Sequence, residues 1–455
     1  MAIFKTATGA GFAAMAGSPS AQAALTPSDL RKAYKLTKAS PNNGKGRLVA
    51  IVDAFSDPKL VADLKVYRSH FHLPPCTRAN GCLHILNQRG KKGPLPPARA
   101  GWGLEESLDL DMISAICPRC HITLIEAANS GDTNLGIAEE RAIARGARYI
   151  SNSWGNFEFA AEKNFTHYFN HPGHVIDFAA GDLGYGPTFP AALQFVTSVG
   201  GTSLRRTATR RGWTESVWGT RNNSPKDGTN SGCSAFLPKP SWQRVDVHFT
   251  GACVRRTEND VSAVANPNTG VLVYDTYRFP GPIEVGGTSA SAPIVTAIYA
   301  LAGVPVRNTY PAEYMYLKSS HLFDVTSGVN GICPGRAYLC QGLPGYDGPT
   351  GLGTPNGTAA FTIRRATRVT LIDPGDRRLS TAHQASIKIF GLDSRNASRL
   401  AYHMSAVPGL RIASIPNSTN GIISGRPTTP GTYNVTVTAK DGAVKGTTHF
   451  QIRVS

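Results

Sequence analysis

Short apolar runs alternate with helical patterns between residues 47 and 199, and this alternation limits the fold more than any other feature of the sequence. The run Arg47–Asp53 is apolar after its first residue and ends on an acid, which is typical of a buried parallel strand. Further strands are expected at residues 122–127, 149–154, 175–180 and 194–199, with helices at 58–69, 104–116, 134–146 and 157–170 and a loop over 76–103. The pattern predicts an α/β domain with a mostly parallel sheet flanked by helices, whose ligand chemistry gathers at the carboxyl ends of the strands.

A glycine pair opens the stretch Gly286–Gly303, whose small and apolar residues predict a buried helix. Pro293 fits the first turn of that helix, and Gly303 is its expected stop. Ser289 would then lie at the helix N-terminus, where free N–H groups and the positive end of the dipole favour a nucleophile. The alternative is that a serine or threonine at this position only caps the helix.

Two acids on the predicted helix 104–116 stand four positions apart. Glu105 and Asp109 would share one helical face, where two like charges are unfavourable. One interpretation is a coupled carboxyl pair that shares a proton. The alternative is a solvated acidic face, which the nearby Glu106 and Asp111 would extend. A further acid, Asp182, follows the strand at 175–180 in a glycine-flanked turn, where it is either a site residue or a turn residue bonded to its own backbone.

Three motifs occur together in the order and at about the separations found in the sedolisin family of serine-carboxyl peptidases: Glu105-x-x-x-Asp109, Gly181-Asp182-x-Gly184 and Gly287-Thr288-Ser289-x-x-x-Pro293. The segments 150–155, 199–203 and 324–328 also resemble that family. The resemblance covers residues 25–360 and implies a subtilisin-like fold and a secreted, acid-acting endopeptidase that cleaves protein or peptide substrates.

The resemblance implies four catalytic residues, namely the nucleophile Ser289, the general base Glu105, the acid Asp109 that orients Glu105, and the oxyanion-hole residue Asp182. Asp53 and Trp154 match positions of a supporting hydrogen-bond network. Carboxyl groups suit catalysis in acid, because a histidine base is mostly protonated well below its usual pKa of about 6.5. Asp182 can donate to an oxyanion only while it is protonated, so activity is expected to fall as pH rises.

The same resemblance implies one Ca²⁺ ion per subunit. Its oxygen ligands would be two carboxylates and three backbone carbonyls, from Asp324, Asp347, Val325, Leu343 and Gly345. Family members usually have glycine where Leu343 stands, and a small hydroxyl residue where Ala180 stands. The family's large N-terminal pro-domain is expected to be absent, because the resemblance begins near residue 25.

The sequence changes in character near residue 364. Short strands are expected at residues 369–372, 385–389, 422–425, 433–438 and 450–454, separated by Gly- and Pro-containing turns. We therefore predict three parts: a signal or processing segment at 1–24, a catalytic domain at 25–363, and a small all-β sandwich at 364–455. The last part resembles bacterial immunoglobulin-like modules, which implies contact with a surface or polysaccharide, or a role as a spacer.

Eight cysteines fall into local pairs, Cys76/Cys82, Cys117/Cys120, Cys233/Cys253 and Cys333/Cys340, which favours disulfides and an oxidising compartment. Cys117-x-x-Cys120-His121 also has the spacing of a c-type haem attachment, and zinc is a further alternative. Net charge is +17, yet no dense basic block is present, so no nucleic-acid partner is expected. No run is long and apolar enough to span a membrane, and we expect a monomer. The alternative function is a catalytically inactive peptidase fold that binds cell-surface or polysaccharide ligands.

Overall fold

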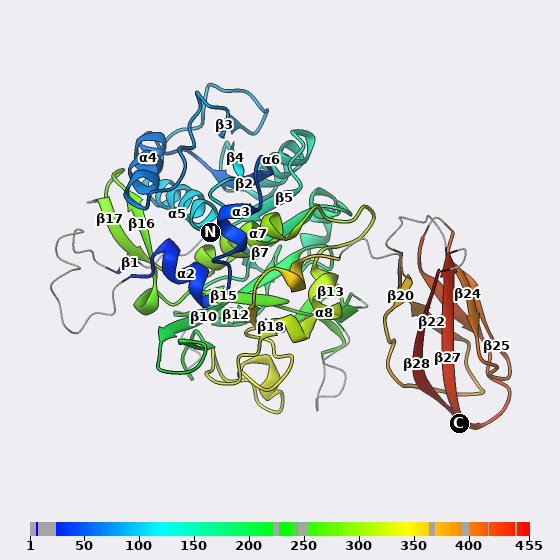
Figure 1. Cartoon of the computed structure of the whole chain (residues 1–455). Helices are drawn as coiled ribbons and strands as arrows, with labels where there is room; N and C mark the ends of the chain where they lie inside the picture. Colours follow the sequence, from blue (N-terminus) through cyan, green and yellow to red (C-terminus); the bar gives the residue numbers. More distant parts are fainter. Residues whose placement is uncertain are drawn as a thin grey trace. The chain divides into compact units, whose positions relative to one another are not determined.

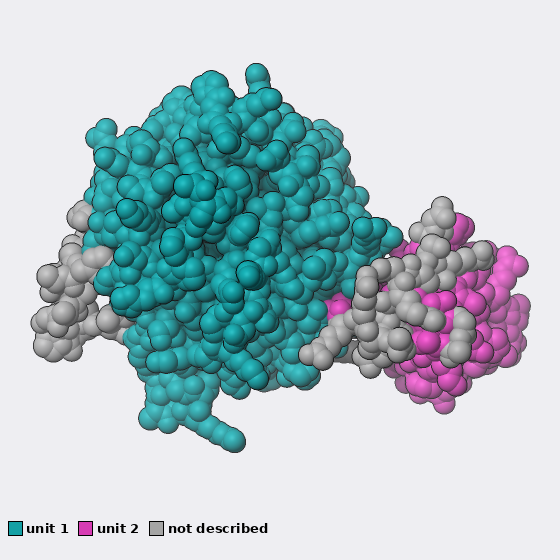
Figure 2. Space-filling view, turned by 45° about the horizontal axis from the view of Figure 1, so that its top comes forward, with its two compact units in different colours: residues 1–239, 246–362 teal, residues 240–245, 363–455 magenta. Residues whose placement is uncertain are grey.

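The structure is a computed structural model, and it describes residues 6–7, 24–221, 227–240, 242–243, 253–279, 281–363, 369–393, 400–416, 418–441 and 444–455. Most of the expected signal segment at 1–24 lies outside these residues. Two compact units are formed, residues 1–239 with 246–362 and residues 240–245 with 363–455 (Figure 2). The predicted domain boundary after residue 363 lies close to this division. Within the described residues, no helix combines the length and the apolar character needed to cross a bilayer.

An eight-stranded, mostly parallel sheet forms the centre of the first unit (Figure 1). Its strands, in spatial order, are β3 (Leu83–Asn87), β4 (His121–Ala127), β2 (Leu48–Ala54), β5 (Tyr149–Asn152), β7 (Val175–Ala179), β10 (Thr197–Arg206) and β11 (Trp213–Val217), with β15 (Val261–Val264) also paired to β10. All of these pairings are parallel except β10 with β11. The predicted α/β architecture is confirmed.

Helices cover both faces of this sheet. Helices α5 (Ala100–Ile116) and α7 (Thr288–Ala302) pack on each other and on one face, and α4 (Leu60–His70) packs beside α5. On the other face, α6 (Asp132–Ala144) and the 3₁₀ helix η1 (Glu162–Phe169) cover an apolar core that includes Val52 and Ala54 of β2. Because successive side chains of a strand point to opposite faces, Asp53 points toward α5 and α7.

Smaller elements surround the sheet. The remaining short helices are α2 (Pro27–Ala33), α3 (Ala39–Asn42), α8 (Ala312–Leu317), η3 (Pro267–Thr269), η4 (Ser319–His321), η5 (Ala337–Leu339) and η6 (Ala359–Phe361). A three-stranded sheet has β1 (Thr6–Ala7) and β16 (Val271–Asp275) on either side of β17 (Gly281–Val285). The two-stranded pairs are β6 (Asn156–Phe157) with β9 (Thr188–Phe189), β8 (Leu183–Tyr185) with β12 (Gly228–Ser231), β13 (Cys233–Pro238) with β14 (Arg255–Thr257), and β18 (Leu322–Phe323) with β19 (Thr354–Pro355).

Four expectations about local structure are wrong. The helix predicted at 157–170 is only the 3₁₀ helix 162–169, because residues 156–157 pair with β9 instead. The loop predicted at 76–103 contains β3, which adds a parallel edge strand to β4. The strand predicted at 194–199 starts at Thr197 and runs on to Arg206. Helix α7 begins at Thr288, so Pro293 lies inside the helix and not in its first turn.

The cysteines form four disulfides, each joining one of the local pairs: Cys76–Cys82, Cys117–Cys120, Cys233–Cys253 and Cys333–Cys340. No cysteine is left free. The haem and zinc alternatives are therefore wrong, since the thiols of Cys117 and Cys120 that either group would need are bonded to each other.

The strands of the second unit pair antiparallel, except that β21 (Arg377–Leu379) pairs parallel with β28 (Val444–Val454). The strands of this unit form a four-stranded, a three-stranded and a two-stranded sheet from β20 (Val369–Leu371), β21, β22 (Ala385–Ile389), β23 (Gly391–Asp393), β24 (Ala401–Met404), β25 (Leu410–Ser414), β26 (Gly421–Gly425), β27 (Gly431–Asp441) and β28. Alternate residues such as Val435, Val437 and Ala439 face a shared apolar core. The predicted all-β part is confirmed, with four strands that the sequence did not predict (β21, β23, β24 and β25).

Candidate active site

Helix α5 carries the predicted carboxyl pair into the interior. Glu105 and Asp109 are both fully buried on the helix face that packs against α7 and β2. Burial raises the pKa of each side chain well above its usual value, and the neighbouring acids, Asp53 among them, raise it further. Glu106 and Asp111 are also buried, so the solvated acidic face is wrong. The raised pKa values of Glu105 and Asp109 favour the protonated forms, and carboxyls that interact in this way titrate as a group.

Ser289 occupies the second position of α7 and is 4% exposed. The residue before the helix is Gly287, whose φ of +114° is a conformation that favours glycine, and no side chain of this segment caps the helix. The capping alternative is therefore wrong for Ser289. Its hydroxyl is close enough to Glu105 to lower the pKa of that carboxyl, and neither carboxylate oxygen of Glu105 has a hydrogen-bond partner in the described part of the chain.

The proline inside α7 leaves one carbonyl near the nucleophile without its helical partner. Pro293 has no N–H, so the carbonyl oxygen of Ser289, four residues earlier, cannot receive the usual helical hydrogen bond. The hydroxyl of Ser153 lies 3.4 Å from this oxygen and 2.9 Å and 3.0 Å from the two carboxylate oxygens of Asp109. Ser153 therefore links the nucleophile's backbone to the acid behind the base.

Asp182 reaches the start of α7 from the turn after β7. Its Oδ1 accepts hydrogen bonds from the backbone N–H of Thr288 at 2.7 Å and from the Thr288 hydroxyl at 2.8 Å. Its other oxygen, Oδ2, lies so close to Gly287 that a Cβ there would come within 2.7 Å of it. Because Oδ1 already accepts twice, Oδ2 is the oxygen that can carry a proton. Burial raises the pKa of Asp182 to about 6, so that proton is held in acid.

Asp53 lies near enough to the carboxyl pair to raise the pKa of both acids, whereas Trp154 contacts the strand that carries Asp53. The indole Nε1 of Trp154 donates to the backbone carbonyl of Val52 at 3.0 Å. Asp53 is fully buried, neither of its oxygens has a hydrogen-bond partner among the described residues, and burial raises its pKa to about 8. Trp154 therefore supports the strand that carries Asp53, and Asp53 raises the pKa of both Glu105 and Asp109.

A cavity of about 230 Å³ opens in front of these groups. Ser289, Asp182 and Thr288 line one part of it, together with Ser153, Trp154, Gly155, Asn156, Phe157, Ala179, Gly181, Leu183, Thr188 and Asn230. The carbonyl of a scissile peptide bond placed in this cavity could contact both the Ser289 hydroxyl and the Asp182 carboxyl. The structure thus brings five of the six predicted active-site residues around one cavity or directly behind it, with Asp53 next to Glu105 and Asp109.

The residues predicted to hold Ca²⁺ come from two loops that meet. Asp324 accepts the N–H of Gly345 at 2.8 Å, and the fully buried Asp347 accepts the N–H of Leu343 at 3.0 Å. A Cβ on Gly342 would lie 2.9 Å from the carbonyl oxygen of Val325, so the two loops are in contact. Burial, with the nearby Asp324, raises the pKa of Asp347 well above its usual value. Carboxylate and carbonyl oxygens are the donors that suit a hard cation such as Ca²⁺.

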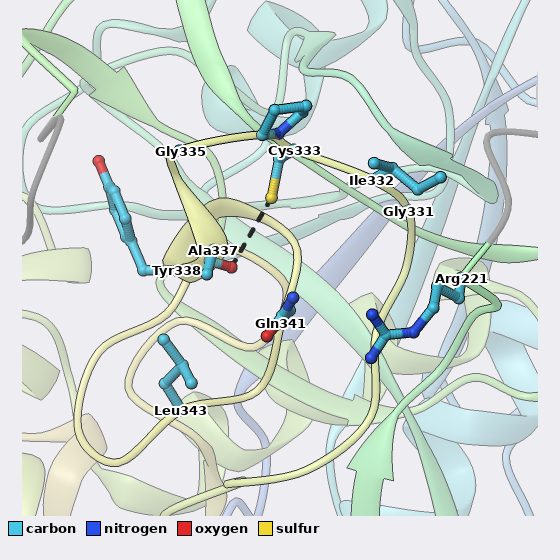
Figure 3. Close-up of a pocket in the computed structure, with 10 residues that line it drawn as sticks. Arg221, Gly331, Ile332, Cys333, Gly335, Ala337, Tyr338, Gln341 and Leu343 are labelled. Atoms are coloured by element: carbon cyan, nitrogen blue, oxygen red, sulfur yellow. Dashed lines mark hydrogen bonds between the residues drawn. The ribbon is translucent and has the colours of Figure 1, made fainter.

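A second hollow borders this loop pair (Figure 3). It has a volume of about 480 Å³, and the lining residues are Arg221, Gly331, Ile332, Cys333, Pro334, Gly335, Ala337, Tyr338, Gln341 and Leu343. Its only charged lining residue is Arg221, and it contains no nucleophile or carboxyl group. It therefore lacks the chemistry found around Ser289.

Three residues of the site were given no role in the sequence analysis. Ser153 and Thr288 hold Asp109 and Asp182 in place, yet each is a hydroxyl residue beside a more conspicuous one, Trp154 or Ser289. A serine in a strand end and a threonine before a helix are common, so their positions alone gave no signal. Glu106 is a third case, since its buried carboxyl adds to an acidic group that also includes Glu126.

Comparisons with known proteins support the resemblance. Residues 100–314 match the "Subtilase family" model, and residues 415–455 match the "Putative Ig domain" model. The chain is 30% identical to kumamolisin from Bacillus sp. over 364 residues, which cover 74% of this chain and 63% of that protein. It is 33% identical to sedolisin from Pseudomonas sp. over 178 residues, covering 37% and 29% of the two chains. It is 25% identical to human tripeptidyl-peptidase 1 over 378 residues, covering 73% and 63%.

A solved structure shows the same fold. Pseudomonas sedolisin, a serine-carboxyl proteinase complexed with two molecules of pseudo-iodotyrostatin, superposes with a TM-score of 0.61 at 24% identity, over 73% of this chain and 95% of that one. The chain spans somewhat less than two thirds of the length of kumamolisin and of tripeptidyl-peptidase 1. The chain is thus similar to sedolisin and kumamolisin over much of its first unit, and it shares the fold of sedolisin. On its C-terminal side, residues 415–455 match an immunoglobulin-like domain.

Proposed function

We propose that the first unit is an acid-acting serine-carboxyl endopeptidase with Ser289 as its nucleophile. The observation that carries the proposal is the placement of Ser289 between two kinds of carboxyl group. Glu105 lies behind its hydroxyl, and Asp182 faces the same cavity in front of it. Among the relatives, tripeptidyl-peptidase 1 is a peptidase by name and Pseudomonas sedolisin is described as a serine-carboxyl proteinase, which supports the same reaction class.

The proton movements follow from this placement. Glu105, in its ionised form, takes the proton of the Ser289 hydroxyl as the serine oxygen attacks the peptide carbonyl. Asp109 is held in place by the Ser153 hydroxyl, and its raised pKa keeps it protonated in acid, the form in which it can stabilise the charge on Glu105. The protonated Glu105 then gives its proton to the leaving amine, and water later releases the acyl group by the reverse sequence. A histidine would be protonated and inactive as a base under the acidic conditions in which this carboxyl pair works.

Asp182 supplies the other half of the chemistry. With its proton on Oδ2, it donates a hydrogen bond to the oxyanion that develops in the transition state. Thr288 keeps Oδ1 occupied and so directs the proton to the oxygen that can donate. Above its pKa of about 6, Asp182 becomes negative and repels the oxyanion. The upper pH limit of activity is therefore assigned to this residue.

We further propose that the contacting loops at Asp324 and Asp347 bind one Ca²⁺. The two carboxylates and the carbonyls of Val325, Leu343 and Gly345 offer only oxygen donors. A bound cation would neutralise the buried Asp347, which has no cationic side chain paired with it among the described ion pairs. Its role would be to hold the two loops together.

The setting of the protein is proposed from its cross-links and its second unit. Four disulfides are typical of proteins made for an oxidising compartment, which supports secretion. In the C-terminal unit, Lys and Arg outnumber Asp and Glu, and exposed side chains such as Lys388 and Arg411 lie on the β22–β26–β25 sheet. That charge would favour contact with an anionic surface or polysaccharide.

A comparison of two serine variants tests the peptidase proposal. Ser289→Ala should abolish the hydrolysis of a denatured protein in acid. Ser291→Ala is the matched control, because Ser291 lies on the same helix but donates to the carbonyls of Ala263 and Val264, away from the cavity. The proposal would be contradicted if both variants kept the wild-type rate, or if the folded wild type showed no hydrolysis in acid.

A further inference from the structure

Three aspartates that take no part in the proposed reaction meet near the start of α5. Asp57 follows β2, Asp63 lies in the first turn of α4, and Asp275 ends β16. One carboxylate oxygen from each lies within 4.8 Å of the others, and all three side chains are buried. The three residues are 8%, 2% and 0% exposed, respectively. Three separate segments of the chain thus converge on one small acidic site.

The hydrogen bonds at this site come from neutral groups. The N–H of Lys59 donates to Asp57, the N–H and hydroxyl of Thr276 donate to Asp63, and the N–H of Tyr277 donates to Asp275. None of the ion pairs in the described segments includes one of these carboxylates. The acids act on one another, since burial and the neighbouring carboxylates raise the pKa of Asp57 to about 6 and of Asp275 to about 7. Three buried carboxylates without a positive group are strongly unfavourable.

One oxygen at the site is buried and has no hydrogen-bond donor. Oδ1 of Asp275 accepts the N–H of Tyr277 at 2.6 Å, which leaves Oδ2 inaccessible to water and without a partner among the described residues. Asp275 itself is fully buried. Buried polar atoms are nearly always paired in native proteins, so an unpaired carboxylate oxygen beside two other carboxylates indicates a missing positive ligand.

We propose that Asp57, Asp63 and Asp275 bind a hard divalent cation, Ca²⁺, at a site separate from the Asp324 loop. The donors are all carboxylate oxygens, which excludes the nitrogen and sulfur ligands that zinc usually takes. Ca²⁺ binds oxygen at about 2.3–2.6 Å, so two ligands on opposite sides of the ion lie about 4.8 Å apart. The three oxygens all lie within 4.8 Å of one another, so one such ion could contact all three.

An ion here would fasten the helix that carries the catalytic base. A Cβ on Gly103, in the first half of α5, would lie 3.2 Å from the Cβ of Asp57 and 3.1 Å from the Tyr277 ring. The hydroxyl of Ser107, on the same helix, lies 3.5 Å from Oδ2 of Asp57. The cation would therefore join the β2–α4 connection, α4 and β16 directly beside α5.

The test counts the ions that the full chain binds. Metal-free protein is titrated with Ca²⁺ by calorimetry or equilibrium dialysis, for wild type and the variants Asp324→Asn, Asp275→Asn and Asp111→Asn. We expect Asp324→Asn to retain one ion, bound at the aspartate cluster, and Asp275→Asn to lose that ion or bind it at least about tenfold more weakly. Asp111→Asn is the matched control, because Asp111 is buried and accepts the N–H of Tyr274 but is not part of the cluster.

Asp324→Asn leaves the aspartate cluster intact. This variant can therefore test the proposal even if Asp275→Asn does not fold. A rise in its melting temperature on addition of Ca²⁺ supports the site. Failure of this folded variant to bind any Ca²⁺ would overturn the proposal. The proposal would also be overturned if folded Asp275→Asn bound the same number of Ca²⁺ ions as the wild type, with the same affinity. These results do not depend on hydrolysis, so they are distinct from a failure of the peptidase proposal.

Discussion

The two units of the chain differ in what they bury. The first unit encloses a series of acids that are at most 1% exposed, among them Asp53, Glu105, Glu106, Asp109, Asp111, Glu126, Glu139, Asp177, Asp275 and Asp347. In the described part of the second unit, Asp393 is the only buried acid, and the core is apolar. Burying a carboxyl group opposes folding unless a partner or a proton offsets its charge. The difference indicates that the interior of the first unit holds reactive groups at a cost in stability, whereas the interior of the second unit only stabilises its fold.

The largest expected effect is the loss of the catalytic base. Glu105→Gln keeps the size of the side chain but cannot accept the Ser289 proton, so kcat/KM should fall by roughly 10³–10⁴-fold. The measurement is hydrolysis of a denatured protein in acid. Glu140→Gln is the control, because Glu140 is exposed on α6 and should leave the rate unchanged. Equal rates for the two variants would show that the buried acids of α5 have no catalytic role.

Removal of the oxyanion donor should have the next largest effect. Asp182→Ala deletes the group that donates to the developing oxyanion, and kcat/KM should fall by roughly 10²–10³-fold. Asp182→Asn can still accept from Thr288 and keeps an N–H donor at all pH values. We expect it to retain much more activity than Asp182→Ala and to lose the decline above pH 6. A pH profile of Asp182→Asn that matches wild type would assign that decline to another group.

In the second unit the large effects should be on stability only. Ile423 is fully buried at the centre of the β22–β26–β25 sheet, and Ile423→Ala should lower the free energy of unfolding of this unit by about 2–5 kcal/mol. Ile422→Ala, at the half-exposed neighbouring position, should cost much less. Denaturant unfolding gives the stabilities, and kcat/KM should stay at the wild-type value in both. A loss of activity in Ile423→Ala would mean that the units are not independent in function.

The buried acids also predict how stability depends on pH. Asp177 has a pKa of about 8 in the folded state because of burial, against about 3.9 in an unfolded chain. Between these values the folded state holds a proton that the unfolded state releases, so stability is fully present below pH 4 and is lost as pH rises toward 8. The free energy of unfolding of the first unit should therefore be at least about 2 kcal/mol lower at pH 7.5 than at pH 4.

Asp177→Asn sharpens this result. It removes one titrating group while keeping an acceptor for the Thr296 hydroxyl, which lies 2.8 Å from Asp177, so the pH dependence should become shallower. The second unit, with few buried acids, should melt almost independently of pH over the same range. A first unit that is most stable near neutral pH would contradict the protonation states assigned to its interior.

The smallest expected effect concerns Trp154. Trp154→Phe removes the hydrogen bond to the Val52 carbonyl, which should cost about 1 kcal/mol of stability. The phenyl ring still packs near Phe178, so the local core is largely kept. We expect kcat/KM to change by less than about fivefold, since Trp154 acts on Asp53 only through the strand. A loss as large as that of Glu105→Gln would place Trp154 in the proton path itself.

The comparison of the units also explains what the sequence could predict. Apolar and polar residues alternate at 433–438, which indicates a strand with one buried face. The strands of the second unit could therefore be predicted from this alternation. The parallel sheet was predictable for the same reason, because runs such as 48–53 are too apolar for an exposed strand. The helix predicted at 157–170 failed because pairing between β6 and β9, which are distant in sequence, overrode local preference.

The proposed catalytic acids were predicted from motifs, but their burial was not visible in the sequence. Glu105 and Asp109 look the same in a solvated helix face as in a buried pair, and only packing of α5 against α7 and β2 distinguishes the two. Ser153 was missed because its role depends on the carbonyl that Pro293 leaves unpaired 136 residues away. The aspartate cluster was missed for a similar reason, since Asp275 is more than 200 residues from Asp63 and the two meet only through the fold.

The most direct test of the account is the pH–rate profile of the wild-type protein on a denatured protein substrate. Rates are measured from about pH 2.5 to 8, with Ser289→Ala as the blank. We predict activity that is confined to acid, declines through the pKa of Asp182 near 6, and is absent in the variant. Activity that peaks at neutral or alkaline pH, or that persists in Ser289→Ala, would contradict the assignment of a carboxyl base and a protonated Asp182.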